Sequence, residues 1–102
     1  MRRPAAQGRQ DANQPDIVSG LLYMGATVQV LSAVGQGCPD LMIGWKGQNY
    51  LIEIKNPEKP KGDQRLTPDQ IKWHGFWRGQ KAVARTIEDA IAIINGATGY
   101  DK

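Results

Sequence analysis

The chain has 102 residues, of which 40% are hydrophobic, so it can form one domain with a modest core but not two. Its net charge of +3 is supplied entirely by Arg2, Arg3 and Arg9, because residues 11–102 contain ten basic and ten acidic side chains. The charge balance therefore excludes a strongly basic domain, and composition by itself is poor evidence for a nucleic-acid partner.

The first ten residues are polar and basic, and they lack the apolar stretch that a secretory signal requires. We therefore predict a flexible basic arm over residues 1–10 and a single domain over residues 11–102. The arm could contact phosphate groups in a salt-dependent way, or it could be a terminus without a task.

A lone cysteine, Cys38, excludes an internal disulfide, and the cytoplasm is the simplest compartment for such a chain. We expect Cys38 to be a small buried side chain beside a turn rather than a nucleophile. No apolar run has transmembrane length, so no membrane partner is expected.

A helix is predicted after the arm, capped by Asn13 or Gln14 and ended by Gly25. Its apolar stripe at helical spacing consists of Ile17, Val18, Leu21 and Leu22. An alternating, β-branched strand over 27–31 follows, and a glycine-rich turn over 34–37 leads the chain to Pro39 and Asp40.

The next segment predicts a β-hairpin, with short strands over 41–44 and 49–52 joined at Lys46-Gly47. A turn centred there places Asp40 opposite Glu53. Since side chains alternate between the two faces of a strand, Lys55 shares the face of Glu53.

Two carboxylates that face each other across a ladder repel, so a cation is expected beside Asp40 and Glu53. The cation could be Lys55 alone, at a charge-balanced sheet edge, or a divalent metal ion. Both strands are apolar on both faces, which predicts a sheet covered on both sides. Because charges are costly in such a setting without a partner, this pattern favours the metal ion.

Residues 56–65 have the composition of a loop, and Thr67-Pro68-Asp69-Gln70 is typical of a capping box that starts a helix reaching about residue 78. On that helix, Trp73, Phe76 and Trp77 are expected in the core or at a subunit interface. A strand over 82–84 and a helix from Thr86 to Ile94 complete the chain.

The order helix, three strands, helix, strand, helix predicts an α/β fold, αβββαβα, with a small mixed sheet of about four strands flanked by helices. Pro39-Asp40 and Glu53-Ile54-Lys55 resemble the signature of the PD-(D/E)XK nuclease superfamily. From about Asp11 to Ile94 the chain is similar to small stand-alone VRR-NUC domains of phages and bacteria. Four segments in the family's order carry this resemblance: 13–18, 35–41, 53–55 and 66–70.

The resemblance implies a restriction-endonuclease-like core and a metal-dependent DNA endonuclease that uses Mg²⁺ or Mn²⁺. It implies that Asp40, Glu53 and the main-chain carbonyl of Ile54 hold the metal ion. Lys55 then orients or helps to deprotonate the attacking water and offsets charge on the phosphate.

Two further residues match catalytic positions of the family. Asp16 matches an acidic residue of the first helix, although a carboxylate in a first helical turn is also favoured by the helix dipole. Gln70 matches a glutamine that approaches the active site, but the same position completes the capping box. Both alternatives stay open for each residue.

Stand-alone members of the family act as homodimers on branched DNA, notably four-way Holliday junctions, so the resemblance implies the same partner here in a bacterial or phage-infected cell. The candidate contacts to nucleic acid are Lys59, Lys61, Arg65, His74, Arg2 and Arg3. The alternative is a non-catalytic nucleic-acid-binding or adaptor module that retains the nuclease fold.

Overall fold

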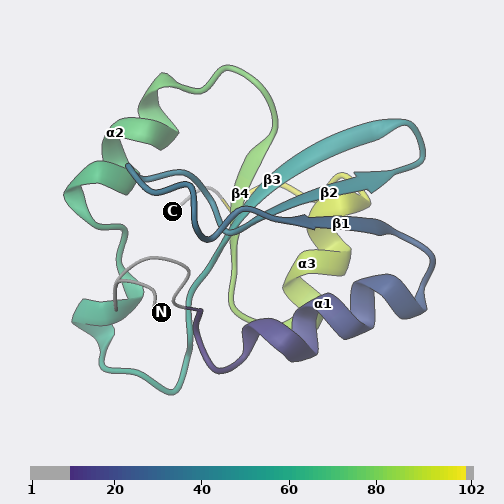
Figure 1. Ribbon diagram of the computed structural model, residues 1–102, viewed down its shortest axis with the longest axis horizontal. Coiled ribbons are helices and arrows are strands. Elements are labelled where there is room, and N and C mark those ends of the chain that lie inside the picture. The colour runs from purple at the N-terminus through teal and green to yellow at the C-terminus, as the bar shows by residue number, and fades with distance from the viewer. Residues whose placement is uncertain (1–9, 101–102) are drawn as a thin grey trace, which may run out of the picture.

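The predicted order of elements is confirmed in the computed structural model, which describes residues 10–100 (Figure 1). The described residues form three α-helices and four strands, in the order α1 (Gln14–Tyr23), β1 (Thr27–Val30), β2 (Leu41–Trp45), β3 (Gln48–Ile54), α2 (Pro68–Phe76), β4 (Lys81–Ala84) and α3 (Ile87–Ile94). The loop before α2 contains a short 3₁₀ helix, η1 (Lys61–Gln64), which was not predicted.

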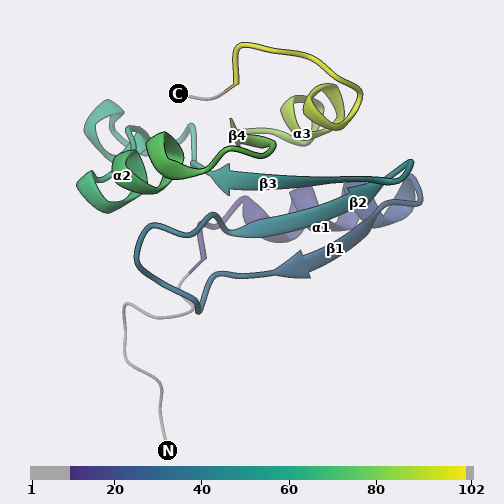
Figure 2. The same ribbon diagram turned by 90° about the horizontal axis from the view of Figure 1, so that it is seen from above.

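The four strands form one mixed sheet in the order β1-β2-β3-β4 (Figure 2). The first three strands are antiparallel, whereas β4 lies parallel to β3 after the crossover that contains α2. The predicted α/β architecture, a small mixed sheet flanked by helices, is therefore observed.

The β2–β3 hairpin has the predicted register, with Trp45 opposite Gln48 and Leu41 opposite Ile52. Lys46 and Gly47 form its two-residue turn, and both have positive φ angles, 51° and 79°. Turns of this kind match the right-handed twist of the strands that they join. The register therefore follows from a local feature of the sequence.

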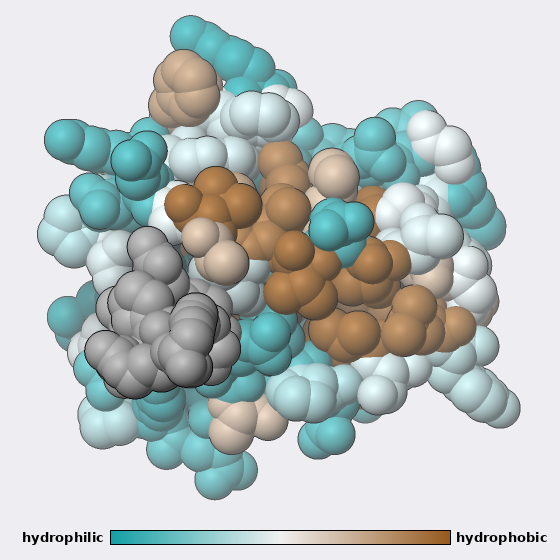
Figure 3. All heavy atoms as spheres, in the orientation of Figure 1, coloured by the Kyte–Doolittle hydropathy of each residue, from teal (hydrophilic) through white to brown (hydrophobic). Residues whose placement is uncertain are grey.

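The core lies on one face of the sheet, where α1 and α3 run side by side (Figure 1). Apart from Ala26, which precedes β1, its members come from both helices and from all strands except β1: Ile17, Leu21, Leu41, Ile43, Tyr50, Ile52, Ile54, Ala82, Ala84, Ala90, Ile93 and Ile94. A band of hydrophobic residues also reaches the surface over β1 and α1 in Figure 3. Leu22 of α1 and Val30 of β1 are 54% and 43% exposed.

The opposite face is only partly covered, which corrects the expectation of a sheet enclosed on both sides. Leu51 and Val83 are buried on this face, but Met42 is 37% exposed. The reason is the position of α2, which lies beyond the end of β3 and away from α1 and α3 (Figure 2). Only the part of this face near α2 is shielded from solvent.

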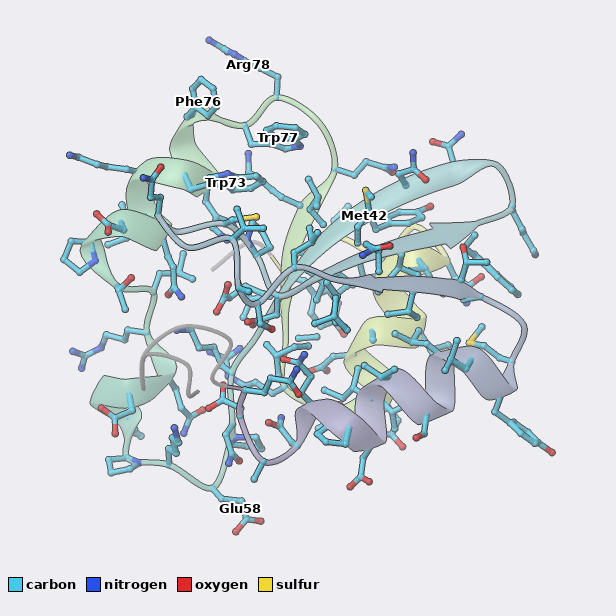
Figure 4. The ribbon with its side chains drawn as sticks, in the orientation of Figure 1. Met42, Glu58, Trp73, Phe76, Trp77 and Arg78 are labelled. Carbon is cyan, nitrogen blue, oxygen red and sulfur yellow. The ribbon has the colours of Figure 1, made fainter. Side chains whose placement is uncertain are left out.

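The aromatic residues of α2 do not belong to the core of this chain. Trp73 and Trp77 stack on each other with ring centroids 4.9 Å apart, and Phe76 is 70% exposed (Figure 4). The prediction that these residues lie in the core is wrong, because α2 packs at the edge of the fold. Their other predicted role, a subunit interface, remains a prediction.

The loop between β1 and β2 fixes the position of α2 through Gly37. Gly37 has a φ of +83°, and a Cβ atom at this position would overlap the main-chain carbonyl of Asp69 in the first turn of α2. Only glycine allows this close approach. The contact holds the start of α2 against the loop that leads into Asp40.

Replacing Gly37 by alanine is expected to lower the free energy of unfolding by more than about 2 kcal/mol, because strain and overlap with Asp69 add. Gly35→Ala is the matched control, since Gly35 has a φ of +81° but a Cβ atom there would meet no other described atom within 4 Å. Gly35→Ala should lower the free energy of unfolding by only about 1 kcal/mol. Urea unfolding of both variants measures the difference, and equal losses would contradict the role of the Asp69 contact.

Candidate active site

Asp40 and Glu53 come together at the end of the β2–β3 ladder, as the register predicts. Asp40 lies directly before β2, and its Oδ2 atom accepts a hydrogen bond of 2.7 Å from the Ile54 N–H. Glu53 is on β3 and is 4% exposed. The aspartate side chain thus takes the place of a main-chain acceptor and is held beside Glu53.

Glu53 is buried and Asp40 is partly buried beside it, and this perturbs the titration of both carboxyl groups. Burial, followed by the charge of Asp40, raises the pKa of Glu53 from 4.5 to about 9. Burial also raises the pKa of Asp40, although the Ile54 N–H opposes the rise. A pair that resists carrying two negative charges favours either a shared proton or a bound cation.

The main-chain carbonyl of Ile54 faces the same site as the carboxyl groups of Asp40 and Glu53. In an extended strand the N–H and C=O of one residue point to the same side, so this carbonyl points toward β2, as the Ile54 N–H does. Continuing the register by two residues sets Pro39 opposite Ile54. Because proline has no N–H, it cannot donate to that carbonyl. The oxygen is therefore positioned to act as a third ligand.

These groups fit a hard divalent cation. The Glu53 Oε1 atom is buried and has no hydrogen-bond partner within residues 10–100, which is costly unless a cation or water lies there. No cluster of three or more His, Cys, Asp or Glu side chains suited to a metal ion occurs in the described part of the chain. Two carboxylates and a carbonyl suit Mg²⁺ or Mn²⁺, which keep waters and bind substrate phosphate, better than Zn²⁺.

Lys55 lies on the same face, where Gln70 of α2 connects it to Glu53. The Lys55 Nζ atom donates to Gln70 Oε1 at 2.8 Å and lies 3.8 Å from Glu53 Oε2. The Gln70 Nε2 atom donates to the same Glu53 oxygen at 2.9 Å. Lys55 is only 6% exposed, so its ammonium is held in one place beside the carboxyl pair.

Gln70 also completes the predicted capping box, so its two alternative roles coexist. Its Oε1 atom accepts from the Thr67 N–H at 2.9 Å, while the Thr67 hydroxyl accepts from the Gln70 N–H at 3.3 Å. One amide oxygen has two lone pairs and can accept from both Lys55 and Thr67. The start of α2 and the position of the ammonium are therefore set by one side chain.

The two roles of Gln70 can be separated with a matched pair of variants. Thr67→Ala removes one cap hydrogen bond but keeps Gln70, so it should lower the free energy of unfolding by about 1 kcal/mol and leave cleavage of DNA unchanged. Gln70→Ala should lower stability similarly and also reduce cleavage by at least about tenfold. Equal activity of the two variants would show that Gln70 only caps the helix.

Asp16, the predicted catalytic residue of the first helix, is exposed on α1, and Gln14 takes the inward position instead. Gln14 is 1% exposed, and its Nε2 atom donates to Ser32 Oγ at 3.3 Å. Ser32 Oγ lies 3.5 Å from Asp40 Oδ1. Residues two apart on a helix point about 200° apart, so α1 cannot turn both side chains toward the carboxyl pair. The structure therefore does not bring Asp16 to the carboxyl pair.

Asp11 and Asn13 lie near the site but were not predicted as site residues. The charge of Asp11 raises the pKa of both Asp40 and Glu53, so it lies close enough to act on them. Asn13 occupies the predicted N-cap position of α1, but its side chain makes no cap hydrogen bond. It donates instead to the carbonyls of Lys55 and Arg85. An acidic and an amide residue at the start of a predicted helix were the only signals available.

Cys38 is partly buried next to the site and has no partner cysteine. Burial, with smaller contributions from Glu53 and Asp40, raises the pKa of its thiol. A thiol held in its neutral form is a poor nucleophile. This agrees with the expected role of Cys38 as a small side chain beside the turn.

No family model, curated protein or solved structure matches this chain. Within residues 10–100, no helix combines the length and the apolar character needed to cross a bilayer. A function can therefore be inferred only from the geometry of the site and from the resemblance of its motifs.

The predicted nucleic-acid contacts are distributed over three places. Lys59 forms an ion pair with Asp11 at 3.0 Å, so its charge is partly compensated near the site. Lys61, Arg65 and the buried His74 line one groove beside α2. Arg2 and Arg3 lie outside the described residues.

Proposed function

We propose that this protein is a metal-dependent DNA endonuclease of the PD-(D/E)XK type, similar to stand-alone VRR-NUC domains. The observation that carries the proposal is the pairing of the buried Glu53 with the partly buried Asp40, beside which Gln70 holds Lys55. Such a group is a weak source of folding stability, because the cost of desolvating a buried ion pair can exceed the attraction between its charges.

In this proposal, Asp40, Glu53 and the Ile54 carbonyl hold Mg²⁺ or Mn²⁺. When bound, the ion offsets phosphate charge and makes a water molecule a better nucleophile. Lys55 donates from its ammonium to the water or to a phosphate oxygen, and Gln70 keeps the ammonium at that point. Burial of Glu53 and Lys55 limits competing water and strengthens each of these interactions.

A cleavage assay tests the proposal. Labelled four-way junction, flap and linear duplex are incubated with the protein in Mg²⁺, in Mn²⁺ or in EDTA. We expect cleavage only with a metal ion, with branched DNA, such as the Holliday junction, preferred over linear duplex as the resemblance implies. Cleavage in EDTA would contradict the mechanism. Binding of DNA without cleavage in either metal ion would favour a non-catalytic module.

We also propose that the active form is a homodimer in the cytoplasm of a bacterial or phage-infected cell. The exposed aromatic residues of α2 support a subunit interface, because large exposed apolar patches often mark association sites. Phe76→Ser should convert the dimer to a monomer in sedimentation experiments, whereas Tyr23→Ser should not, although Tyr23 is 95% exposed. A wild type that is monomeric at all concentrations would refute this part.

A further inference from the structure

A basic groove of about 780 Å³ lies between η1, α2 and β4. Its four cationic residues are Lys61, Arg65, Lys81 and Arg85. Leu66 and Ile71 supply apolar surface in the same groove, and none of the acidic residues within 10–100 lines it. Its volume falls in the range of about 300–1,000 Å³ that is typical of ligand pockets.

None of the four cations of this groove forms an ion pair within residues 10–100. The ion pairs within residues 10–100 are Lys55–Glu53 and Lys59–Asp11, and neither involves a cation of the groove. Arg85 is instead fixed by the side chain and carbonyl of Gln64, at 3.2 and 3.3 Å. Lys81 donates to the Trp77 carbonyl at 3.0 Å. Neutral acceptors thus position two cations whose charge is left available for an anion.

The groove adjoins the candidate active site on two sides. Gln70, which holds Lys55, and His74, which lines the groove, are one helical turn apart on α2, a rise of about 6 Å. On the other side, Arg85 follows Ala84, whose carbonyl accepts the Lys55 N–H at 3.0 Å. The groove and the Lys55 ammonium therefore lie next to each other along α2 and β4.

We propose that the groove binds an unpaired segment of the nucleic-acid strand next to the scissile phosphate. The inference rests on the proposed function. The cations contact backbone phosphates, and Leu66 and Ile71 contact the face of an unstacked base. A paired base is stacked within its duplex and cannot offer that face, so the groove selects a single-stranded overhang or branch over a blunt duplex.

Fluorescence anisotropy with labelled DNA in Ca²⁺ tests this selection. The probes are a duplex with a single-stranded overhang of about four nucleotides and the same duplex with blunt ends. We expect wild type to prefer the overhang, and Arg65→Ala/Lys81→Ala to weaken overhang binding by at least about tenfold. The salt dependence should fall by about 0.7 for each phosphate that the variant no longer neutralises. Ile71→Ala should weaken binding without changing that salt dependence.

The matched control is Lys46→Ala/Arg78→Ala, which removes the same charge outside the groove. Lys46 lies on the hairpin turn, and Arg78 points away from the molecule in Figure 4. We expect the affinity of this control for the overhang probe to stay within about twofold of wild type. Equal effects of the two double variants, equal binding of both probes by wild type, or displacement of the overhang by polyglutamate of the same charge would each overturn the inference.

The assay also separates this inference from the proposed endonuclease. Loss of the overhang preference in the groove variant, in a protein that cuts no DNA, would support the groove and refute the nuclease. Metal-dependent cleavage, with no effect of the groove variant on DNA binding, would support the nuclease and refute the groove.

Discussion

Lys55→Met is expected to reduce metal-dependent DNA cleavage by about a thousandfold while leaving Mg²⁺ binding intact. Methionine has a similar length and suits a position that is 6% exposed. The substitution removes the donor that lies 2.8 Å from Gln70 Oε1 and 3.8 Å from Glu53 Oε2. Because a positive charge leaves the site, affinity for a divalent cation should stay the same or increase.

Single-turnover cleavage and calorimetric Mg²⁺ titration, run on the same preparation, measure the two effects. Lys46→Met is the control, since Lys46 lies on the hairpin turn at the other end of the ladder, and it should behave as wild type. Lys55→Arg should not restore activity, because a planar guanidinium cannot reproduce a compact ammonium in a buried position. Cleavage by Lys55→Met at the rate of wild type would contradict the role given to this residue.

In EDTA, the protein is expected to lose stability as the pH rises from about 5 to 9. The pKa of Glu53 is raised to about 9 in the folded state from 4.5, so the folded protein keeps a proton that the unfolded chain releases. This contribution to stability is complete below pH 4.5 and is lost as the pH rises through 9. The melting temperature should fall by on the order of 10 °C.

Glu53→Gln removes both the titration and the repulsion by Asp40. The variant keeps a carbonyl oxygen that can accept from Gln70 Nε2, so it should fold normally and melt at a temperature that changes little with pH. Mg²⁺ should raise the melting temperature of wild type at pH 8 and should not raise that of the variant. Glu58→Gln is the control, because Glu58 points into solvent from the loop in Figure 4. A wild type whose melting temperature rises with pH in EDTA would show that Glu53 is ionised in the folded state.

The hairpin and the residues at its end could be predicted because they depend on local rules. The turn residues Lys46 and Gly47 fix the register, and the two-residue period of a strand then assigns Asp40 and Glu53 to each other. The sequence did not decide whether Gln70 belongs to the active site or to the capping box, because each role was inferred from a separate local pattern. The structure shows that one amide makes both sets of hydrogen bonds.

Positions set by packing between distant segments could not be predicted in the same way. The rotation of α1 about its axis decides that Gln14, rather than Asp16, turns toward Asp40, and that rotation depends on how the helix packs on the sheet. Similarly, helical spacing on α2 indicates a shared surface for Trp73 and Phe76 but not what covers it. The basic groove combines a loop, a helix and a strand edge, so no single segment of sequence reveals it.

The most direct test of the metal centre is anomalous diffraction from a crystal soaked in Mn²⁺. We predict a peak between the carboxylates of Asp40 and Glu53, roughly 2.1 Å from an oxygen of each and within reach of the Ile54 carbonyl. A well-ordered site without such a peak, with the two carboxyl groups sharing a proton at saturating Mn²⁺, would contradict it.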